Sequence, residues 1–337
     1  MALWKLKLED WINKRLVANF GTISAAIGQT AGYAGYSRLS LFLALSRTRH
    51  GLLDVCTPLL VALLWLGHVP DAATAGLGIL AALAGYTSVY ALNDIVDYRT
   101  DKEKLEQTGE VDKGDYLDGT AIRHPLARGY LSMNEAIAWA GGWGAVSLSA
   151  AFALNPICAF ILVLGCMLEA VYCLMLRVSH LRTLVSGVIK TLGGLAAVFA
   201  VDVLPDPALL LLVFFWLFFW EIGGQNIPAD WHDIDEDTLL EARTVPVAFG
   251  PETAGHLVLF TLGISLLLSA VLFAAVPLHF PLLLYFAALG VGIYLCMVPG
   301  VRLWLHKDRD SASALFNRAS WYPCALLAVV LLALTIG

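Results

Sequence analysis

Six aspartates fall into two copies of one spacing pattern. Residues 93–101 read NDIVDYRTD and residues 229–237 read ADWHDIDED, so both segments contain Asp-x-x-Asp-x-x-x-Asp. On a helix, offsets of three, four and seven residues place the three carboxylates on one face. Three like charges on one face repel one another unless water or a cation offsets them. The aspartates of the pattern are Asp94, Asp97, Asp101, Asp230, Asp233 and Asp237.

These carboxylates predict a metal-bound diphosphate. Carboxylate oxygens are hard ligands, and Mg²⁺ is typically held by one or two carboxylates together with phosphate oxygens of a substrate. Two facing clusters therefore indicate a diphosphate bridged between them by Mg²⁺. We predict that all six aspartates are metal ligands and that Asp94, Asp97 and Asp230 are catalytic as well. The alternative is that both segments are solvated acidic loops. Two matched motifs, each at the boundary of a predicted span, count against that alternative.

Cations near the two motifs fit the same ligand. Arginine binds phosphate oxygens through its planar, bidentate guanidinium. Lys190 is predicted to be catalytic because a lone charge inside an apolar stretch needs a functional partner; the alternative is that it snorkels to the membrane surface. Other cations in these loops are alternatively charges that only set topology. The predicted substrate-binding residues are Asn93, Arg123, Arg128, Tyr172, Arg177, Asn226 and Arg243.

Two glutamates also occur within or at the end of apolar stretches. They are Glu169, one turn before Tyr172, and Glu221. Both orientation of an acceptor molecule and a plain hydrogen bond between helices fit these positions, and the sequence leaves the two open.

Nine apolar stretches must position these residues. Of the 337 residues 59% are hydrophobic and only 14% are charged, against about 25% charged in a soluble domain. A bilayer core needs about 20 apolar helical residues to cross it, and a span must be helical because unpaired backbone groups are costly in hydrocarbon. We therefore predict an all-α polytopic membrane protein with spans at about 52–69, 72–92, 133–153, 156–176, 183–202, 207–225, 256–276, 281–300 and 319–336.

The basic residues predict the orientation of these spans. The loops 1–51, 93–132, 177–182, 226–255 and 301–318 hold 20 of the 21 Lys and Arg residues, and Lys190 is the exception. By the positive-inside rule these loops are cytoplasmic. We expect an integral protein of a bacterial-type inner or plasma membrane, whose active site faces the cytoplasm.

Two segments are expected to lie outside the spans. Residues 1–50 mix basic residues with tryptophan and leucine, which predicts an amphipathic helix in the membrane interface, followed by a transmembrane domain over 51–337. Residues 102–122 are charged and rich in glycine, which predicts a mobile loop; a lid over the site is the alternative. The six cysteines lie in apolar stretches without a Cys-x-x-Cys pair and are interpreted as packing residues.

The paired motifs resemble the hallmarks of the UbiA superfamily of intramembrane prenyltransferases, including 4-hydroxybenzoate polyprenyltransferases and chlorophyll synthases. The family motifs follow its second and sixth helices, as do residues 93–101 and 230–237 here. Residues 124–129 (HPLARG) resemble a family Arg-Pro-Leu-x-x-Gly segment, with His124 in place of the arginine. Residues 244–250 (TVPVAFG) resemble the stretch that follows the second motif, and Tyr172 with Leu176-Arg177 resembles a family Tyr…Leu-Lys segment.

The resemblance implies a nine-helix bundle around a lipid-open cavity, with a cytoplasmic helical cap. It implies Mg²⁺ as cofactor and transfer of a prenyl group from a prenyl diphosphate to a lipophilic or aromatic acceptor, as in quinone, tetrapyrrole or related lipid biosynthesis. The alternative within this reaction is a non-aromatic acceptor such as a glycerol or sugar phosphate. The expected partners are the donor, the acceptor and the lipid bilayer, and no nucleic acid.

Two other classes of membrane protein also depend on acidic residues. A phosphatidyltransferase acting on CDP-alcohols also uses aspartates and Mg²⁺, but its Asp-Gly-x-x-Ala-Arg run does not occur here. A cation-coupled transporter would place its acidic residues near the middle of the membrane in broken helices. The aspartates of this chain instead cluster at one end of the predicted spans, which favours the prenyltransferase.

Overall fold

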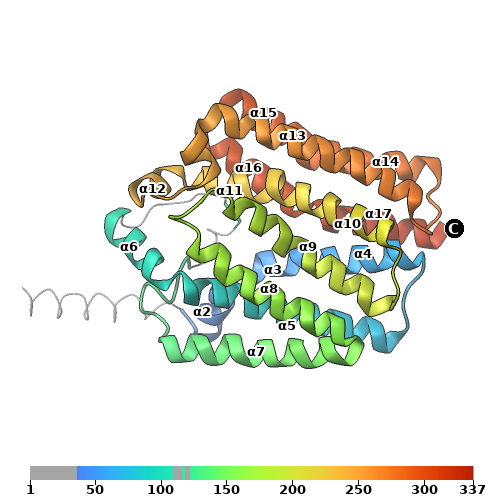
Figure 1. The fold of residues 1–337 in the computed structure, drawn as a ribbon, viewed down its shortest axis with the longest axis horizontal. Helices are drawn as coiled ribbons and strands as arrows, with labels where there is room; N and C mark the ends of the chain where they lie inside the picture. Colours follow the sequence, from blue (N-terminus) through green and yellow to red (C-terminus); the bar gives the residue numbers. More distant parts are fainter. Residues whose placement is uncertain (1–35, 109–115, 118–121, 337) are drawn as a thin grey trace, which may run out of the picture.

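The computed structural model describes residues 36–108, 116–117 and 122–336, and every long element in that part of the chain is a helix. Nine of the described helical segments are long and apolar enough to cross a membrane, which confirms the predicted fold. They run roughly parallel in one bundle (Figure 1). In chain order the spans are α3 (Thr48–Asp54) with α4 (Cys56–Leu66), α5 (Ala72–Val96), α7 (Met133–Leu154), α8 (Pro156–Leu174), α9 (Arg182–Val201), α10 (Pro207–Trp220) continued by η2 (Glu221–Asn226) and α11 (Ile227–His232), α13 (Val245–Ala275), α14 (Leu282–Gly292) continued by η3 (Ile293–Met297) and α15 (Val298–His306), and α16 (Arg309–Ser320) with α17 (Tyr322–Ile336).

The starts of several spans are fixed by side-chain caps. The side chains of Asp71, Asn155 and Asp206 accept hydrogen bonds from the first backbone N–H groups of α5, α8 and α10. Pro156 and Pro207 occupy the first position of their helices, where no backbone N–H is needed. Short Asn-Pro and Asp-Pro junctions therefore begin α8 and α10 at the end of the bundle opposite the two aspartate motifs.

Several helices extend further than the apolar stretches predicted. The sixth span continues from 225 to His232, the seventh begins at Val245 rather than 256, and the ninth begins at Arg309 rather than 319. All three extensions lie at the same end of the bundle. Hydropathy locates the part of a helix that faces hydrocarbon, whereas the helix itself continues into the polar region beyond it.

The segments expected to lie outside the spans are partly described. Residues 1–35, which carry most of the predicted interfacial helix, lie outside the described residues; α2 (Arg38–Leu45) follows them. Within the predicted loop 102–122, the loop prediction is wrong for residues 102–108, because they belong to helix α6 (Tyr98–Thr108). Lys104 on this helix pairs with acidic residues of the second motif, which anchors α6 to the bundle.

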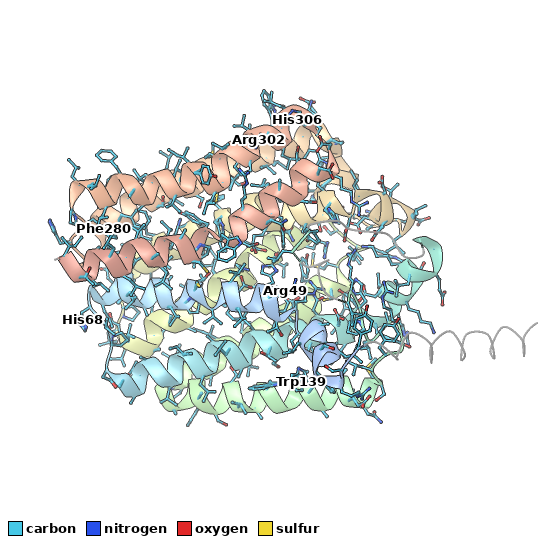
Figure 2. All side chains as sticks on the ribbon, turned by 180° about the vertical axis from the view of Figure 1, so that it is seen from behind. Arg49, His68, Trp139, Phe280, Arg302 and His306 are labelled. Carbon is cyan, nitrogen blue, oxygen red and sulfur yellow. The ribbon has the colours of Figure 1, made fainter. Side chains whose placement is uncertain are left out.

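The polar elements gather at one end of the bundle. Helices α2, α6 and α12 (Ile234–Leu239) lie together at the left of Figure 1. Seen from behind, His68 and Phe280 lie at the opposite end, at the turns after α4 and before α14 (Figure 2). The end that carries both aspartate motifs is therefore the charged end of the bundle, whereas the described turns at the opposite end hold no Lys or Arg.

Candidate active site

Both aspartate motifs bend at their middle residue. Helix α5 ends at Val96, Asp97 has φ −81° and ψ 1°, and α6 begins at Tyr98. In the second motif α11 ends at His232, Asp233 has φ −96° and ψ 10°, and α12 begins at Ile234. The backbone bonds across both bends persist, with Asp101 N to Asp97 O and Asp237 N to Asp233 O each 2.8 Å. Each motif therefore spans two helices instead of one continuous helix.

One cavity of about 530 Å³ brings the two motifs together. All six aspartates line it, although corresponding aspartates of the two motifs lie 136 positions apart in the chain. The cavity lies at the charged end of the bundle and reaches inward between the spans. The other predicted site residues that line it are Asn93, Arg123, Tyr172, Lys190 and Asn226.

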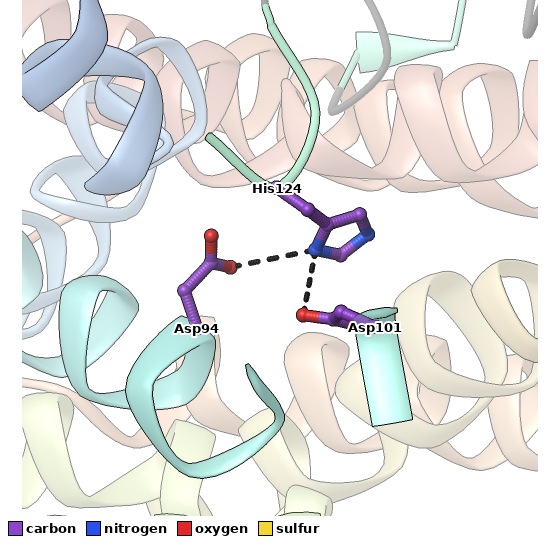
Figure 3. A group of neighbouring side chains, drawn as sticks. All are labelled: Asp94, Asp101 and His124. Carbon is purple, nitrogen blue, oxygen red and sulfur yellow. Dashed lines mark ion pairs between the residues drawn. The ribbon is translucent and has the colours of Figure 1, made fainter. Parts of the chain in front are cut away.

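Asp94 and Asp101 of the first motif converge on His124. Its Nδ1 lies 2.8 Å from Asp101 Oδ2 and 3.7 Å from Asp94 Oδ1 (Figure 3). Burial opposes protonation of His124, but the adjacent Asp101 carboxylate outweighs it and raises the pKa of the imidazole. Arg47 Nη2 also contacts Asn93 Oδ1 at 2.9 Å. The ligand atoms of Asp94, Asp101 and His124 lie within 4.8 Å of one another, which suits a shared cation.

Lys104 and Arg123 bind the second motif. Lys104 Nζ lies 3.2 Å from Asp233 Oδ2 and 3.5 Å from Asp237 Oδ1, and Arg123 Nη2 lies 2.6 Å from Asp233 Oδ2. Burial nevertheless raises the pKa of Asp237, and burial together with the nearby Asp101 charge raises the pKa of Asp97 to about 6. The nearby cations therefore do not fully offset the cost of burying these two carboxylates in charged form.

Arg182 contacts both the second motif and the ring of Tyr172. Its Nη1 donates to Asp230 Oδ1 at 2.9 Å, and its guanidinium carbon lies 4.0 Å from the centre of the Tyr172 ring. Asn226 Nδ2 donates to the Tyr172 hydroxyl at 3.0 Å. A guanidinium stacked on an aromatic ring and paired with a carboxylate is held in one orientation.

Lys190 lies apart from the aspartate motifs. Its Nζ donates to Asp54 Oδ1 at 2.6 Å and to Gln225 Oε1 at 2.9 Å, and lies 3.9 Å from Glu221 Oε2. The side chain is therefore paired inside the bundle, in contrast to the snorkelling alternative. Its predicted catalytic role stays a prediction.

Three predicted substrate-binding arginines do not line the cavity. Arg128 Nε donates to Arg123 O at 2.8 Å, and the half-exposed Arg177 pairs with Glu103 at 2.7 Å. The backbone N–H of Arg243 donates to Leu176 O at 2.8 Å. The roles of these three residues, like those of the predicted residues that line the cavity, stay predictions.

Sequence reasoning missed several charged residues of the site, and four of them show why. Arg47 precedes the first span, Asp54 lies inside it, Lys104 lies in the segment expected to be a loop, and Glu236 falls between two motif aspartates. Asp54 carried a usable signal, because a lone carboxylate in an apolar stretch needs a partner. The other three lie in charged segments, where nothing in the spacing distinguishes them.

A second, apolar cavity of about 370 Å³ adjoins the first. Tyr86, Val89 and Ile189 line both cavities and mark their junction. Glycine and alanine make up most of the wall that α5 and α9 contribute. The hydroxyl of Tyr86 packs against Gly193, where an added Cβ would lie 2.7 Å from it. A ligand with a charged head and a long apolar chain fits the two cavities together.

The residues present fit a divalent cation. Among the described residues that line the polar cavity, nine carboxylates face six Lys and Arg side chains, a formal charge of −3 with the histidines neutral. Asp230 Oδ2 is buried without a hydrogen-bond partner within the described residues. A buried, unpaired carboxylate oxygen is costly unless it binds a cation. Oxygen ligands of this kind suit Mg²⁺.

Fold and site together define a helical integral membrane protein with an acidic, metal-compatible cavity. Residues 55–334 match the model of the UbiA prenyltransferase family. Digeranylgeranylglyceryl phosphate synthase of Thermococcus sibiricus is 24% identical over 267 residues, covering 79% of this chain and 85% of that protein. The apo structure of a UbiA homologue from Aeropyrum pernix has a TM-score of 0.64 at 18% identity, covering 88% of this chain and 98% of the other. A UbiA homologue from Archaeoglobus fulgidus bound to DMAPP and Mg²⁺ has a TM-score of 0.59 at 18% identity, covering 86% and 98%.

The family match covers most of the chain, and the chain therefore belongs to the UbiA prenyltransferase family. The resemblance drawn from the two aspartate motifs is confirmed. The protein is an integral membrane prenyltransferase.

Proposed function

We propose that this chain transfers a prenyl group from a prenyl diphosphate to a lipophilic acceptor, with Mg²⁺ as cofactor. The observation that carries the proposal is the convergence of both aspartate motifs on one cavity. Asp94, Asp101 and the second-motif aspartates would hold the metal, which when bound neutralises the charge that develops on the diphosphate. The relative from Archaeoglobus fulgidus, which binds Mg²⁺ with DMAPP, supports this assignment.

The side chains of the site provide the remaining functions. Arg123, Arg182 and Lys104 would bind diphosphate oxygens that the aspartates alone would repel. The adjoining apolar cavity would take the prenyl chain and keep it from water. Excluding water limits hydrolysis of the reactive allylic group before the acceptor attacks it.

Among acceptors, we propose a glycerol phosphate that carries a lipid chain as the first to test. The Thermococcus sibiricus relative is named for a product of this kind. Arg47 and Arg49 also line the polar cavity, so the cavity has cations beyond those beside the second motif, which suits an acceptor with its own phosphate. An aromatic acceptor of quinone or tetrapyrrole biosynthesis is the other candidate, and the stacked Tyr172 beside Arg182 favours it.

We further propose that the charged end of the bundle faces the cytoplasm. The sequence segments predicted to lie on this side of the membrane hold 20 of the 21 Lys and Arg residues of the chain. Basic loops are retained on the cytoplasmic side during insertion. The water-soluble head of the donor would then enter from the cytoplasm.

The proposal is tested with Asp94→Asn and Asp230→Asn in purified protein reconstituted in nanodiscs. Each substitution removes one carboxylate charge while keeping the side-chain volume. Formation of prenylated product from geranylgeranyl diphosphate, Mg²⁺ and geranylgeranylglyceryl phosphate is followed by mass spectrometry, with 4-hydroxybenzoate as the second acceptor. We expect at least a 100-fold loss of turnover in both variants.

The matched control is Asp310→Asn, which makes the same change at the exposed start of α16. Full activity of either motif variant would overturn the metal assignment. Product formation by the wild type in the presence of a chelator would overturn the Mg²⁺ requirement.

A further inference from the structure

The polar cavity contains a second charged tier, deeper in the bundle than the aspartate motifs. It consists of Asp54 on α3, Lys190 on α9 and Glu221 at the start of η2. Glu221 accepts a hydrogen bond from Ser186, which lies one turn beyond Arg182 on α9, and Arg182 contacts Asp230, so this tier lies about one helical turn, or about 6 Å, further inward. Ionisable side chains at such depth are expensive and mark functional sites.

Within this tier, one carboxylate oxygen is left for a ligand. Asp54 accepts from Lys190 at 2.6 Å on one oxygen and from the Tyr90 hydroxyl at 2.5 Å on the other. Glu221 Oε1 accepts from Ser186 Oγ at 2.8 Å. Glu221 Oε2 is buried and has no hydrogen-bond partner within the described part of the chain, although the ammonium of Lys190 lies 3.9 Å from it. Only 7% of Glu221 is exposed, yet the residue lines the cavity.

The backbone is distorted where Glu221 lies. Residues Glu221–Asn226 form a π-helical segment, a rare widening of the helix that occurs mostly at functional sites. Its wider turn lets both Gln225 and Asn226, which are adjacent in sequence, line the cavity together with Glu221. Gly223 on the same segment packs tightly, since an added Cβ would lie 2.3 Å from Thr261 Oγ1. The packing therefore holds the widened turn in place.

This tier lies on the path of the prenyl chain that the proposed function requires. Ile189, next to Lys190, lines both the polar and the apolar cavity, as does Tyr86, one turn from Tyr90. A donor whose diphosphate binds at the aspartates and whose chain enters the apolar cavity passes beside Glu221. Asp54 and Glu221 face Lys190, and His50 Nε2 lies 3.7 Å from Asp54 Oδ1. With His50 neutral the tier carries a surplus negative charge, which favours uptake of a proton.

We infer that Glu221 accepts the proton that the acceptor loses, an inference that rests on the proposed function. The acceptor's oxygen or carbon forms a bond to C1 of the prenyl group, and the C1–O bond breaks with its electron pair leaving on the diphosphate. The proton released by the acceptor's O–H or C–H group passes to Glu221 Oε2. The same bonds form and break, and one proton is released, whether the acceptor is an alcohol or an aromatic ring.

The test compares Glu221→Gln and Glu221→Asp with wild type in the geranylgeranyl transfer assay described above. Glu221→Gln keeps the side-chain size but removes the basic oxygen, so turnover should fall about 100- to 10,000-fold while KM for donor and acceptor changes little. Glu221→Asp keeps a carboxylate and should retain more turnover than Glu221→Gln. The matched control is Glu252→Gln, the same change at an exposed glutamate that pairs with Lys307.

The outcomes separate the two proposals. A wild type that forms no prenylated product overturns the proposed function and this inference with it. An active wild type with Glu221→Gln turnover within about threefold of it overturns only the role of Glu221. A raised acceptor KM at unchanged turnover also overturns it, because Glu221 would then only bind the acceptor. The melting temperature of each variant is measured alongside, and an unchanged value shows that the loss of turnover is not a loss of fold.

Discussion

Replacing Lys190 by methionine should destabilise the bundle strongly. The ammonium of Lys190 lies 2.6 Å from Asp54 and 3.9 Å from Glu221, with side-chain exposures of 10%, 3% and 9%. Removing one member of a buried ion pair leaves an uncompensated charge and costs about 3–5 kcal/mol. Methionine fills much of the same volume, so lost packing contributes little. We therefore expect the free energy of unfolding of Lys190→Met to fall by about 3–5 kcal/mol, with Asp54 as the main cause.

A double-mutant cycle assigns that cost to the pair. Asp54→Asn is added to Lys190→Met, and unfolding is measured by titration from mild detergent into SDS. The double variant should regain much of the lost stability, because the nearer of the two carboxylates beside the vacated position is then neutral and Glu221, 3.9 Å from the lost ammonium, is the one that stays charged. A Lys190→Met variant within about 1 kcal/mol of the wild type would refute this account of the pair. Donor KM in the same preparation tests the catalytic role predicted for Lys190, since an unchanged value contradicts binding of the diphosphate.

Three further perturbations follow from the structure. Gly223→Ala should lower the free energy of unfolding by about 1–3 kcal/mol through overpacking, whereas Gly141→Ala, with no atom within 4 Å of the new Cβ, should not lower it; equal melting temperatures of the two variants would contradict this. Gly193→Val should narrow the junction beside Tyr86 and reduce kcat/KM for geranylgeranyl diphosphate relative to dimethylallyl diphosphate. Each five-carbon unit kept out of the apolar cavity would lose up to about 4 kcal/mol of binding free energy, at about 0.8 kcal/mol per carbon. An unchanged ratio of the two kcat/KM values would show that the chain takes another route. Lys104→Met should tighten Mg²⁺ binding measured by calorimetry without donor, because a competing ammonium is removed, and weaker binding would refute that competition.

The architecture and the acidic core of the site are readable from the sequence. Long apolar stretches report directly on helices in hydrocarbon, and the spacing of the aspartates identifies both motifs. The bends at Asp97 and Asp233 are not readable, because the i to i+4 backbone bonds continue through them and no glycine or proline marks the break. Helix α6 could not be predicted from the sequence, because a run of charged residues is equally typical of a solvated loop.

The sequence also does not predict which residues from other helices contact a given charged side chain. Lys190 was assigned to the diphosphate because it is a lone cation in a span, yet its nearest oxygens belong to Asp54 and Gln225. Hydropathy gives the depth of a residue in its span but not the rotation of that span against its neighbours. The π-helical segment that begins at Glu221 adds to this difficulty, because it rotates the side chains that follow it about the helix axis by part of a turn.

The bend at Asp97 has a consequence for the freedom of helix α6. Asp94 belongs to the membrane-spanning α5, whereas Asp101 belongs to α6, beyond the bend. A ligand bound to both carboxylates would therefore tie α6 to the bundle and restrict its local opening. Backbone amides of α6 should then exchange with deuterium more slowly when Mg²⁺ and a non-hydrolysable donor analogue are present. The amides in the middle of α5, already within a packed span, should show no such slowing.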